Sequence, residues 1–407
     1  MKTSTLLVGY ALATALPGTL AWPGMTKTMA DLKSKLSERQ DSSGEFDSDE
    51  LIGDLATVGA TTAVGKAIKD IILGDADPES DVKLSGTLPA KGSKACAADT
   101  CCVWKYIAND MAAKFKGSSG RCNKFARAAV RLGFHDAGAW SKQTGGTGAD
   151  GSIILASGEI NRAENKGLQD IAKITKAWYD SYKKYGVSAA DVIQMGANVA
   201  TVVCPLGPRV RSFVGRKDST TPAVDGLLPN VFADADSLIQ LFKDKTIKQH
   251  GLTALVGAHT TSQQLFVDPS RARDPQDSTP GVWDVLFYGQ TLSNDVPKRV
   301  FKFPSDVKLS QHPDISAEWQ KFVNDQGDWN EDYAREYVRL SLLGVNNINS
   351  LTECTAVLPP AVKAFKNPDN TAIAAWLKGK FNVLGSYLED GTLLSSTLLT
   401  LLGILLG

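Results

Sequence analysis

From Cys96 to Cys354 apolar residues recur every three or four positions, the spacing of a helix with one buried face. Two such stripes are Trp104, Ile107, Ala108, Met111 and Phe115, and Leu168, Ile171, Ala172, Thr175, Tyr179 and Tyr182. Ser188-Ala-Ala-Asp191 has the form of a capping box and predicts a helix that continues through Val203. Alternating, strand-like runs are scarce, so we expect a mainly α fold.

The N-terminal part of the chain has a different character. Residues 1–21 combine Lys2, an apolar run and a small-residue end, which is the pattern of a secretory signal peptide. Residues 22–92 lack cysteine and include a polar, acidic run, and we interpret them as an N-terminal extension or propeptide outside the catalytic unit. Within them, Leu51–Leu73 is apolar enough for a helix but has no evident partner. The catalytic domain is expected at 93–358.

The C-terminal tail, residues 359–407, ends in a Leu-rich stretch without charge from Leu393 onward. This stretch is shorter than a membrane-spanning helix. Two interpretations remain open. It could be a cleaved signal for a lipid anchor, with small residues near Gly385-Ser386 or Asp390-Gly391, or it could be an apolar tail that packs on the domain.

Charge and cysteine content restrict the function further. The chain has 407 residues with 44 basic and 44 acidic side chains, so it has no net field to attract nucleic acid or an anionic membrane. An exported chain with six cysteines is expected to form three disulfides, although the residues alone leave the pairing open.

The most informative residues are two histidines, His135 and His259. Arg131 and His135 are four apart, so on a helix their side chains share one face. A neutral base beside a fixed cation suits the cleavage of a peroxide, because one moves a proton and the other stabilises the departing oxygen. His259 has helical spacing with apolar residues before it, and a buried imidazole of this kind can be the axial ligand of haem iron. Together they predict the two sides of a haem pocket.

Arg131, Phe134, His135 and Asp136 resemble the distal-pocket motif of the plant and fungal haem peroxidases, and the chain is most similar to the secreted fungal ligninolytic (class II) type. Further matching motifs follow in the same order: Gly148–Ile153, Glu159–Asn165, Cys204–Pro208, Gly215–Pro229 and Asp277–Asp284. The resemblance implies the haem-peroxidase fold, with two helical lobes and haem b between them. No C-x-x-C-H motif occurs, so the haem is expected without thioether links.

The resemblance also implies roles for individual residues. His135 would accept the proton of hydrogen peroxide, and Arg131 would stabilise the oxygen that leaves. An amide oxygen of Asn165 would fix the tautomer of His135. Phe134 would cover the haem and exclude water, and His259 would bind its iron.

By the same resemblance the chain would bind two Ca²⁺ ions through carboxylate, hydroxyl and carbonyl oxygens. The expected ligands are Asp136, Gly148 (carbonyl), Asp150 and Ser152 in one site, and Thr260, Asp277, Thr279, Val282 (carbonyl) and Asp284 in the other. Each ion would brace a segment that carries one of the two histidines. The alternative is that both segments are ordinary polar turns. The disulfides implied by the resemblance are Cys96–Cys102, Cys101–Cys354 and Cys122–Cys204.

One departure from the family concerns the proximal carboxylate. In relatives, a Ser/Thr-Asp-x-x-Leu-x-x-Asp segment supplies the carboxylate that accepts a hydrogen bond from the proximal histidine. We align it with Ser305–His312, so we expect His312 to occupy that position. A neutral imidazole there would raise the reduction potential of the iron and slow peroxide cleavage. Alternatively, Asp314 replaces the carboxylate, or His312 packs inertly.

Two specialised substrate sites of the family are also missing. The positions of the manganese-binding carboxylates are Lys124, Ala128 and Leu265, and the surface tryptophan of relatives is replaced by Ala254. Trp140 could serve as another electron relay, although packing is the more ordinary role.

These observations predict a secreted, monomeric haem peroxidase that oxidises small phenolic or aromatic donors with hydrogen peroxide. The alternative is a catalytically weakened or inert haem- and calcium-binding surface protein, with His312 as its lesion. A catalase-like enzyme is disfavoured because its signature surroundings are absent. His250 is expected at the surface or at a helix cap.

Overall fold

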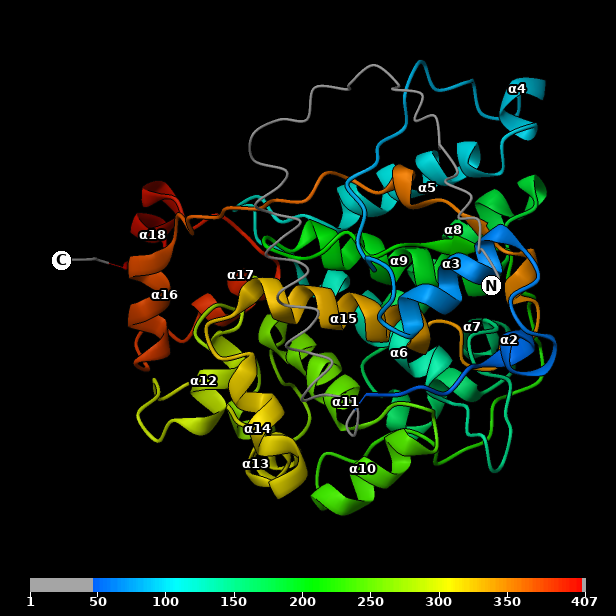
Figure 1. Cartoon of the computed structure of the whole chain (residues 1–407). Coiled ribbons are helices and arrows are strands. Elements are labelled where there is room, and N and C mark those ends of the chain that lie inside the picture. The colour runs from blue at the N-terminus through cyan, green and yellow to red at the C-terminus, as the bar shows by residue number, and fades with distance from the viewer. Residues whose placement is uncertain (1–46, 405–407) are drawn as a thin grey trace, which may run out of the picture. The chain divides into compact units, whose positions relative to one another are not determined.

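Helices dominate the computed structural model, which describes residues 47–404 (Figure 1). The α-helices are α2 (Gly53–Val58), α3 (Ala63–Ile72), α4 (Lys94–Ala97), α5 (Thr100–Phe115), α6 (Lys124–Ala137), α7 (Ser152–Leu155), α8 (Gln169–Tyr182), α9 (Ala189–Val203), α10 (Ala235–Lys243), α11 (Gln249–Val256), α12 (Leu286–Leu292), α13 (Pro304–Gln311), α14 (Pro313–Lys321), α15 (Gln326–Leu340), α16 (Asn370–Leu377), α17 (Leu384–Glu389) and α18 (Ser396–Leu401). The prediction of a mainly α fold is confirmed. The predicted signal peptide lies outside the described residues.

Short elements connect these helices. The 3₁₀ turns are η1 (Glu159–Asn161), η2 (Ala163–Asn165), η3 (Lys183–Tyr185), η4 (Gly257–Thr261), η5 (Pro269–Arg271), η6 (Ile348–Ser350) and η7 (Thr355–Val357). Two strands, β1 (Phe213–Val214) and β2 (Thr352–Glu353), pair antiparallel, with Phe213 opposite Glu353 and Val214 opposite Thr352.

Side-chain caps set the start of the helices that matter most for the site. Asn123 precedes α6, and its side-chain oxygen accepts hydrogen bonds from the N–H groups of Phe125 and Ala126. Ser188 caps α9 by accepting from the N–H of Asp191 at 3.0 Å, as the capping box predicted. Asp191 does not complete the box, because its carboxylate pairs with the buried Arg216 at 2.9 Å.

The helices form two groups around one hydrophobic core. In the first, α6 and α9 pack together and also contact α5 and α8. In the second, α11 contacts α10, α14 and α15. Arg131 and His135 lie on α6, whereas His259 follows α11 in η4. The two histidine segments therefore belong to different helical groups, as expected for two lobes.

Residues 47–92 correct the expectation of an extension outside the catalytic unit. They belong to the same compact unit as the rest of the described chain, and the side chains of Ile68, Ile71 and Ile72 are buried in its main core. The fully buried Arg339 of α15 donates to the carbonyl oxygens of Ser48 (3.0 Å), Glu50 (2.7 Å) and Ile72 (2.8 Å). The partners that the sequence did not reveal for α3 are therefore η6 and α15.

The predicted disulfides are confirmed. Cys96 pairs with Cys102, Cys101 with Cys354 and Cys122 with Cys204. The second bridge joins α5 to the segment after β2, across 253 residues of sequence, and the third joins the residue before the cap of α6 to the end of α9.

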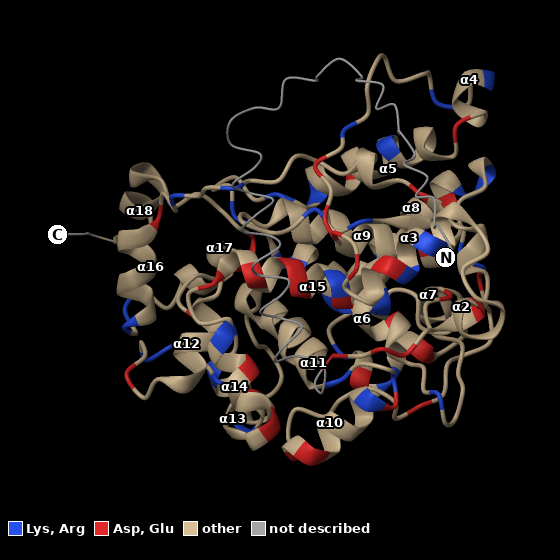
Figure 2. Ribbon diagram, viewed as in Figure 1, with Lys and Arg blue, Asp and Glu red and all other residues tan. Residues whose placement is uncertain are grey.

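The C-terminal tail folds into a second hydrophobic cluster. Trp376, Leu384, Leu394, Leu399 and Ile404 are all buried in it. A buried ion pair between Arg121 and Asp369, 2.9 Å apart, connects the tail to the segment before α6. Within residues 47–404 no helix has the length and apolar character needed to cross a membrane. Basic and acidic residues are interspersed along the ribbon, in keeping with the balanced charge (Figure 2).

His250 is buried rather than at the surface, which corrects the expectation from sequence. Its Nδ1 lies 2.5 Å from a carboxylate oxygen of Glu318, and its Nε2 lies 2.9 Å from one of Asp332. Burial by itself lowers the pKa of His250, but the two carboxylates outweigh it and raise that pKa to about 10. The imidazolium is thus a buried cation that ties α11 to α14 and α15.

A pH-dependent contribution to stability follows from this cation. The pKa of His250 is higher in the folded state than the ordinary histidine value of 6.5, so its stabilisation is complete below about pH 6.5 and disappears as the pH rises toward 10. We expect His250→Gln to lower the free energy of unfolding at pH 6, and the gap to wild type to narrow by pH 10. Denaturant unfolding at several pH values measures this. His312→Gln, a partly exposed histidine that pairs with the exposed Asp236, is the control; a gap for His250→Gln that does not change with pH would contradict the assignment.

Candidate active site

The distal side of the site is built on α6. The Nε–H of Arg131 donates to Nε2 of His135 at 3.1 Å, and Nδ1 of His135 lies 2.8 Å from the side-chain oxygen of Asn165. The amide nitrogen of Asn165 donates to the carbonyl of Glu159 at 2.8 Å, so its oxygen must face His135. Nδ1 of His135 therefore carries the hydrogen, and Nε2 keeps its lone pair.

The charge state of His135 agrees with a role as a base. Burial is the main cause that lowers the pKa of His135 to about 3, and the positive charge of Arg131 adds to the shift. The hydrogen bond to Asn165 opposes it. The imidazole is therefore neutral at physiological pH. Arg131 is held in place by two further hydrogen bonds, from its terminal nitrogens to the carbonyls of Lys166 (2.8 Å) and Glu164 (3.1 Å).

Phe134 lies between aromatic neighbours on the same side. Its ring stacks against Phe242, with centroids 6.1 Å apart, and meets the ring of His135 edge to face at 5.7 Å. The side chain is only partly buried. This position agrees with an apolar wall beside the base, as the sequence suggested.

The proximal side centres on His259. Its Nδ1 lies 2.9 Å from a carboxylate oxygen of Asp306, whose side chain is almost fully buried. The rings of Phe287 and Phe303 meet the imidazole edge to face, with centroids 5.8 and 5.3 Å away. Nε2 has no hydrogen-bond partner among the described residues, and the side chain is 37% exposed, so the ring borders open space.

The proximal carboxylate is thus Asp306, and the expectation that His312 takes this place is wrong. Helix α13 ends at Gln311, and six residues of helix correspond to about 9 Å along the axis, so both residues cannot reach the same imidazole. Nε2 of His312 instead lies 3.0 Å from the carboxylate of Asp236, and its Nδ1 accepts from the N–H of Asp314, which caps α14. Asp314 therefore does not replace the carboxylate either.

These residues fit a haem. His259 has one nitrogen fixed by a carboxylate and the other directed to open space, which is the arrangement of an axial iron ligand with its supporting partner. His135 and Arg131 provide the base and the cation that a bound peroxide needs.

The first expected calcium loop has the character of an incomplete cation site. Asp136 is fully buried, its Oδ2 accepts from the N–H of Gly151 at 3.1 Å, and its Oδ1 has no hydrogen-bond partner. Burial and the negative charge of Asp150 raise the pKa of Asp136 well above its usual range. Asp150 accepts from the N–H of Ser152, and the carbonyl of Gly148 accepts from the N–H of Asp150. A cation would satisfy the orphaned oxygen and offset the two charges.

The second expected loop shows the same imbalance. The hydroxyl of Thr260 lies 2.5 Å from Asp277 and 3.4 Å from Asp284, so two carboxylates converge on one group. Burial raises the pKa of Asp277 well above its usual range and that of Asp284 to about 6. Thr279 donates its N–H to Asp277, and its carbonyl accepts from the N–H of the buried Val282. The five predicted ligands are therefore neighbours, and their excess negative charge fits a divalent cation.

Three of the positions aligned with the specialised substrate sites of the family, or suggested as a relay, can be placed in the structure. Lys124 pairs with Asp390 of the tail at 2.9 Å. Ala254 is fully buried, and its carbonyl accepts a hydrogen bond from the indole of Trp329. Trp140 is partly buried and packs against the main core, in agreement with a packing role.

Sequence reasoning missed two residues of the site. Asp306 was present in the motif and could have been chosen as the carboxylate, since it directly follows Ser305. Glu159 was noted only as part of a motif. Its carbonyl orients Asn165, and its buried carboxylate accepts from Ser152 (3.3 Å) and from the N–H of Ala223 (2.8 Å). Glu159 thus connects the first expected calcium loop to Asn165, which orients the imidazole of His135.

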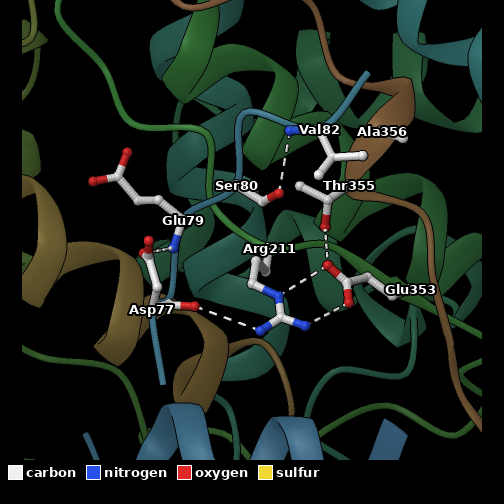
Figure 3. A pocket seen from close by; sticks show the side chains of 8 residues that line it. All are labelled: Asp77, Glu79, Ser80, Val82, Arg211, Glu353, Thr355 and Ala356. Carbon is white, nitrogen blue, oxygen red and sulfur yellow. Dashed lines mark hydrogen bonds and ion pairs between the residues drawn. The ribbon is translucent and has the colours of Figure 1, made fainter. Parts of the chain in front are cut away.

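A separate cavity of about 380 Å³ contains none of the site residues. It is lined by Asp77, Glu79, Ser80, Val82, Arg211, Glu353, Thr355 and Ala356 (Figure 3). Arg211 and Glu353 form a two-point ion pair across it, at 2.9 and 2.6 Å. Because these charges neutralise each other, we assign no chemistry to this cavity.

Comparison with known proteins agrees with this geometry. Residues 107–325 match the family model described as peroxidase. The chain is 31% identical to ligninase LG5 of Phanerodontia chrysosporium over 68% of this chain and 79% of the relative. It is 29% identical to a peroxidase of Arthromyces ramosus (68% and 81%) and 32% identical to ligninase C of Trametes versicolor (64% and 75%). The chain therefore belongs to the peroxidase family and is a haem peroxidase of the class II fungal type.

Proposed function

We propose that this peroxidase reduces hydrogen peroxide with electrons taken singly from small phenolic or similar aromatic donors at the haem edge. The observation that carries the proposal is the pair of fixed imidazoles. His135 has its Nδ1 on Asn165 and its lone pair beside Arg131, and His259 has its Nδ1 on Asp306.

Bound haem would supply the iron that binds the peroxide and holds the oxidising equivalents. His259 would hold that iron through Nε2, and Asp306 would keep the imidazole electron-rich by accepting its Nδ1–H. Nε2 of His135 would take the proton from the peroxide oxygen that approaches the metal. Arg131 would stabilise the negative charge that develops on the oxygen that leaves, and Phe134 would exclude water.

The choice of donor rests on what the surface positions offer. Lys124, Ala128 and Leu265 provide no carboxylate for Mn²⁺, and the buried Ala254 provides no surface indole. Small donors that reach the haem edge are therefore the class that this chain would serve.

The competing interpretation is an inert haem-binding protein. It rested on the expected replacement of the proximal carboxylate by His312. Asp306 now fills that role at 2.9 Å. The structure therefore gives no reason to regard the proximal side as damaged, which favours the enzyme over the inert protein.

We further propose that the two acidic loops bind Ca²⁺. Support comes from the orphaned Oδ1 of Asp136 and from the convergence of Asp277 and Asp284 on Thr260. The N-terminal signal pattern and the three disulfides support export of the chain. The residues on both sides of the site come from one chain, which supports a monomer.

For the tail, we propose a structural role rather than a cleaved anchor signal. Cleavage near residues 385–391 would cut within or directly after α17 and remove Leu394, Leu399 and Ile404 from the second hydrophobic cluster. The carbonyl of Gly391 also accepts hydrogen bonds from Ser119, which would be disturbed.

Rapid mixing with peroxide tests the proposed function. Haem-loaded wild type should show a fast change of the Soret absorbance with hydrogen peroxide and then oxidise a phenol such as guaiacol. His135→Leu should bind haem but react about 10²- to 10⁴-fold more slowly, because the base is lost. Binding of haem without any spectral response to peroxide in wild type would instead favour the inert protein.

The proximal assignment gives a sharper comparison. Asp306→Asn should slow the reaction with peroxide by about 10- to 100-fold and lower the iron–histidine stretching frequency, because the neutral amide lacks the negative charge that the carboxylate places beside His259. His312→Asn should change neither quantity. Stopped-flow spectroscopy and resonance Raman spectroscopy measure the two effects, and the reverse pattern would restore the role first assigned to His312.

Calcium binding predicts a ligand-dependent stability. Removal of Ca²⁺ with a chelator should lower the thermal unfolding temperature. Readdition of Ca²⁺ to a free concentration of 100 times its dissociation constant should raise the free energy of unfolding by about 2.7 kcal/mol. Equilibrium dialysis should find two ions per chain in wild type and one in Asp277→Asn. If neither the chelator nor added Ca²⁺ changes the unfolding temperature, the loops are ordinary polar turns.

A further inference from the structure

A continuous set of buried tryptophan and tyrosine rings lies beside the proximal segment. Trp283 and Trp329 are stacked, with centroids 5.2 Å apart and planes 13° from parallel. Tyr333 meets Trp283 at 4.6 Å, and Tyr288 meets Trp329 at 5.9 Å. All four side chains are almost fully buried, and we call them the aromatic cluster.

The aromatic cluster touches the backbone that leads to His259. The indole N–H of Trp329 donates to the carbonyl of Ala254 at 2.9 Å, and the hydroxyl of Tyr288 donates to that of Thr253 at 2.8 Å. A Cβ at Gly257 would lie 2.4 Å from the indole nitrogen and 2.3 Å from the tyrosine oxygen, so the close approach requires glycine there. The rings thus touch Gly257, which precedes His259 by two positions.

A second contact reaches His259 through a side chain. The ring of Phe287 lies 5.8 Å from the imidazole and 5.4 Å from the ring of Tyr288, centroid to centroid. From the cluster, Tyr333 stacks on Tyr337 at 5.7 Å, and the Tyr337 hydroxyl donates to Gln194. Aromatic contact therefore runs without a gap from the proximal histidine into the core.

These rings can do more than pack, because tryptophan and tyrosine are the side chains most easily oxidised by one electron. The carbonyl of the buried Ala254 binds one of these indoles, so a group of electron-rich rings lies in the interior next to the turn that carries His259.

We propose that the stacked indoles of Trp283 and Trp329 act as a reversible store for one oxidising equivalent during turnover. This inference rests on the proposed function, which supplies the oxidant. One indole would lose an electron and become a cation radical; bound haem, after reaction with peroxide, would supply the oxidising equivalent and take up that electron. The indole would regain an electron as a small donor reduces the protein.

The surroundings favour tryptophan over tyrosine as the site of the missing electron. Oxidation of a phenol releases its proton, but the Tyr288 hydroxyl faces the backbone carbonyls of Thr253 and Ala254, and the Tyr337 hydroxyl faces the side-chain amide of Gln194. None of these groups is a base. A tryptophan can keep its N–H as a cation, as the bond from Trp329 to Ala254 requires. Stacking lets the two indoles share the charge.

The test is electron paramagnetic resonance of haem-loaded protein frozen within milliseconds after one equivalent of peroxide, without donor. Wild type should give an organic radical signal that narrows when the protein is grown with ring-deuterated tryptophan. Trp283→Phe with Trp329→Phe should abolish this signal while the Soret absorbance still responds to peroxide; the unfolding temperature should fall, because two buried indoles and the hydrogen bond to Ala254 are lost. The matched control is Trp178→Phe, a partly buried indole whose ring contacts Phe115 outside the aromatic cluster.

Peptide mapping gives an independent readout. After excess peroxide without donor, oxygenated tryptophan should accumulate at 283 and 329 and not at 178, and protein without haem should show no such preference. The proposed role of Trp283 and Trp329 is wrong if the radical signal survives in the double variant, or if Trp178 is oxidised to the same extent. If the Soret band responds to peroxide but no tryptophan radical forms, this inference fails and the proposed function stands; if the Soret band does not respond, both fail.

Discussion

The site depends on a single constraint that is applied twice: one nitrogen of each imidazole is held, and the other is left available. Asn165 holds Nδ1 of His135, and Asp306 holds Nδ1 of His259. An amide fixes the tautomer of the first ring, which burial and Arg131 keep neutral, whereas a carboxylate makes the second ring electron-rich. The different chemistry of the two histidines therefore comes from their surroundings, because the imidazoles themselves are identical.

The partners are fixed in turn by residues that take no part in the reaction. Glu159 connects Asn165 to the loop with Asp136 and Asp150, so the orientation of the distal base is coupled to an acidic pocket. On the other side, Thr260 follows His259 directly and faces Asp277 and Asp284. A cation in either loop would act on His135 or His259 through the residue that directly follows it, Asp136 or Thr260.

Much of the site could be predicted because its residues are close in sequence or occur in specific motifs. The pair Arg131 and His135 follows from helical spacing, and the disulfides follow from the family resemblance. The proximal carboxylate was assigned to the wrong position of the motif: the alignment placed it at His312, whereas Asp306, six residues earlier, contacts His259, and α13 ends at Gln311 before His312 is reached. The buried cation of His250 was missed because both of its carboxylates come from helices far away in sequence. The role of residues 47–92 was missed for the same reason: their contacts with Arg339 span more than 250 positions.

The contacts of Arg339 have a consequence for the maturation of the protein. Three backbone carbonyls between Ser48 and Ile72 share this one guanidinium, and the isoleucines of α3 complete the main core. A protease that nicked the chain just before residue 93 would therefore not release the preceding segment, which would remain bound as a complementing fragment. Its loss would expose apolar surface and leave a buried guanidinium without acceptors. Any trimming of the N-terminus that yields a durable enzyme is accordingly expected upstream of Asp47, and the mature polypeptide would begin well before its first cysteine.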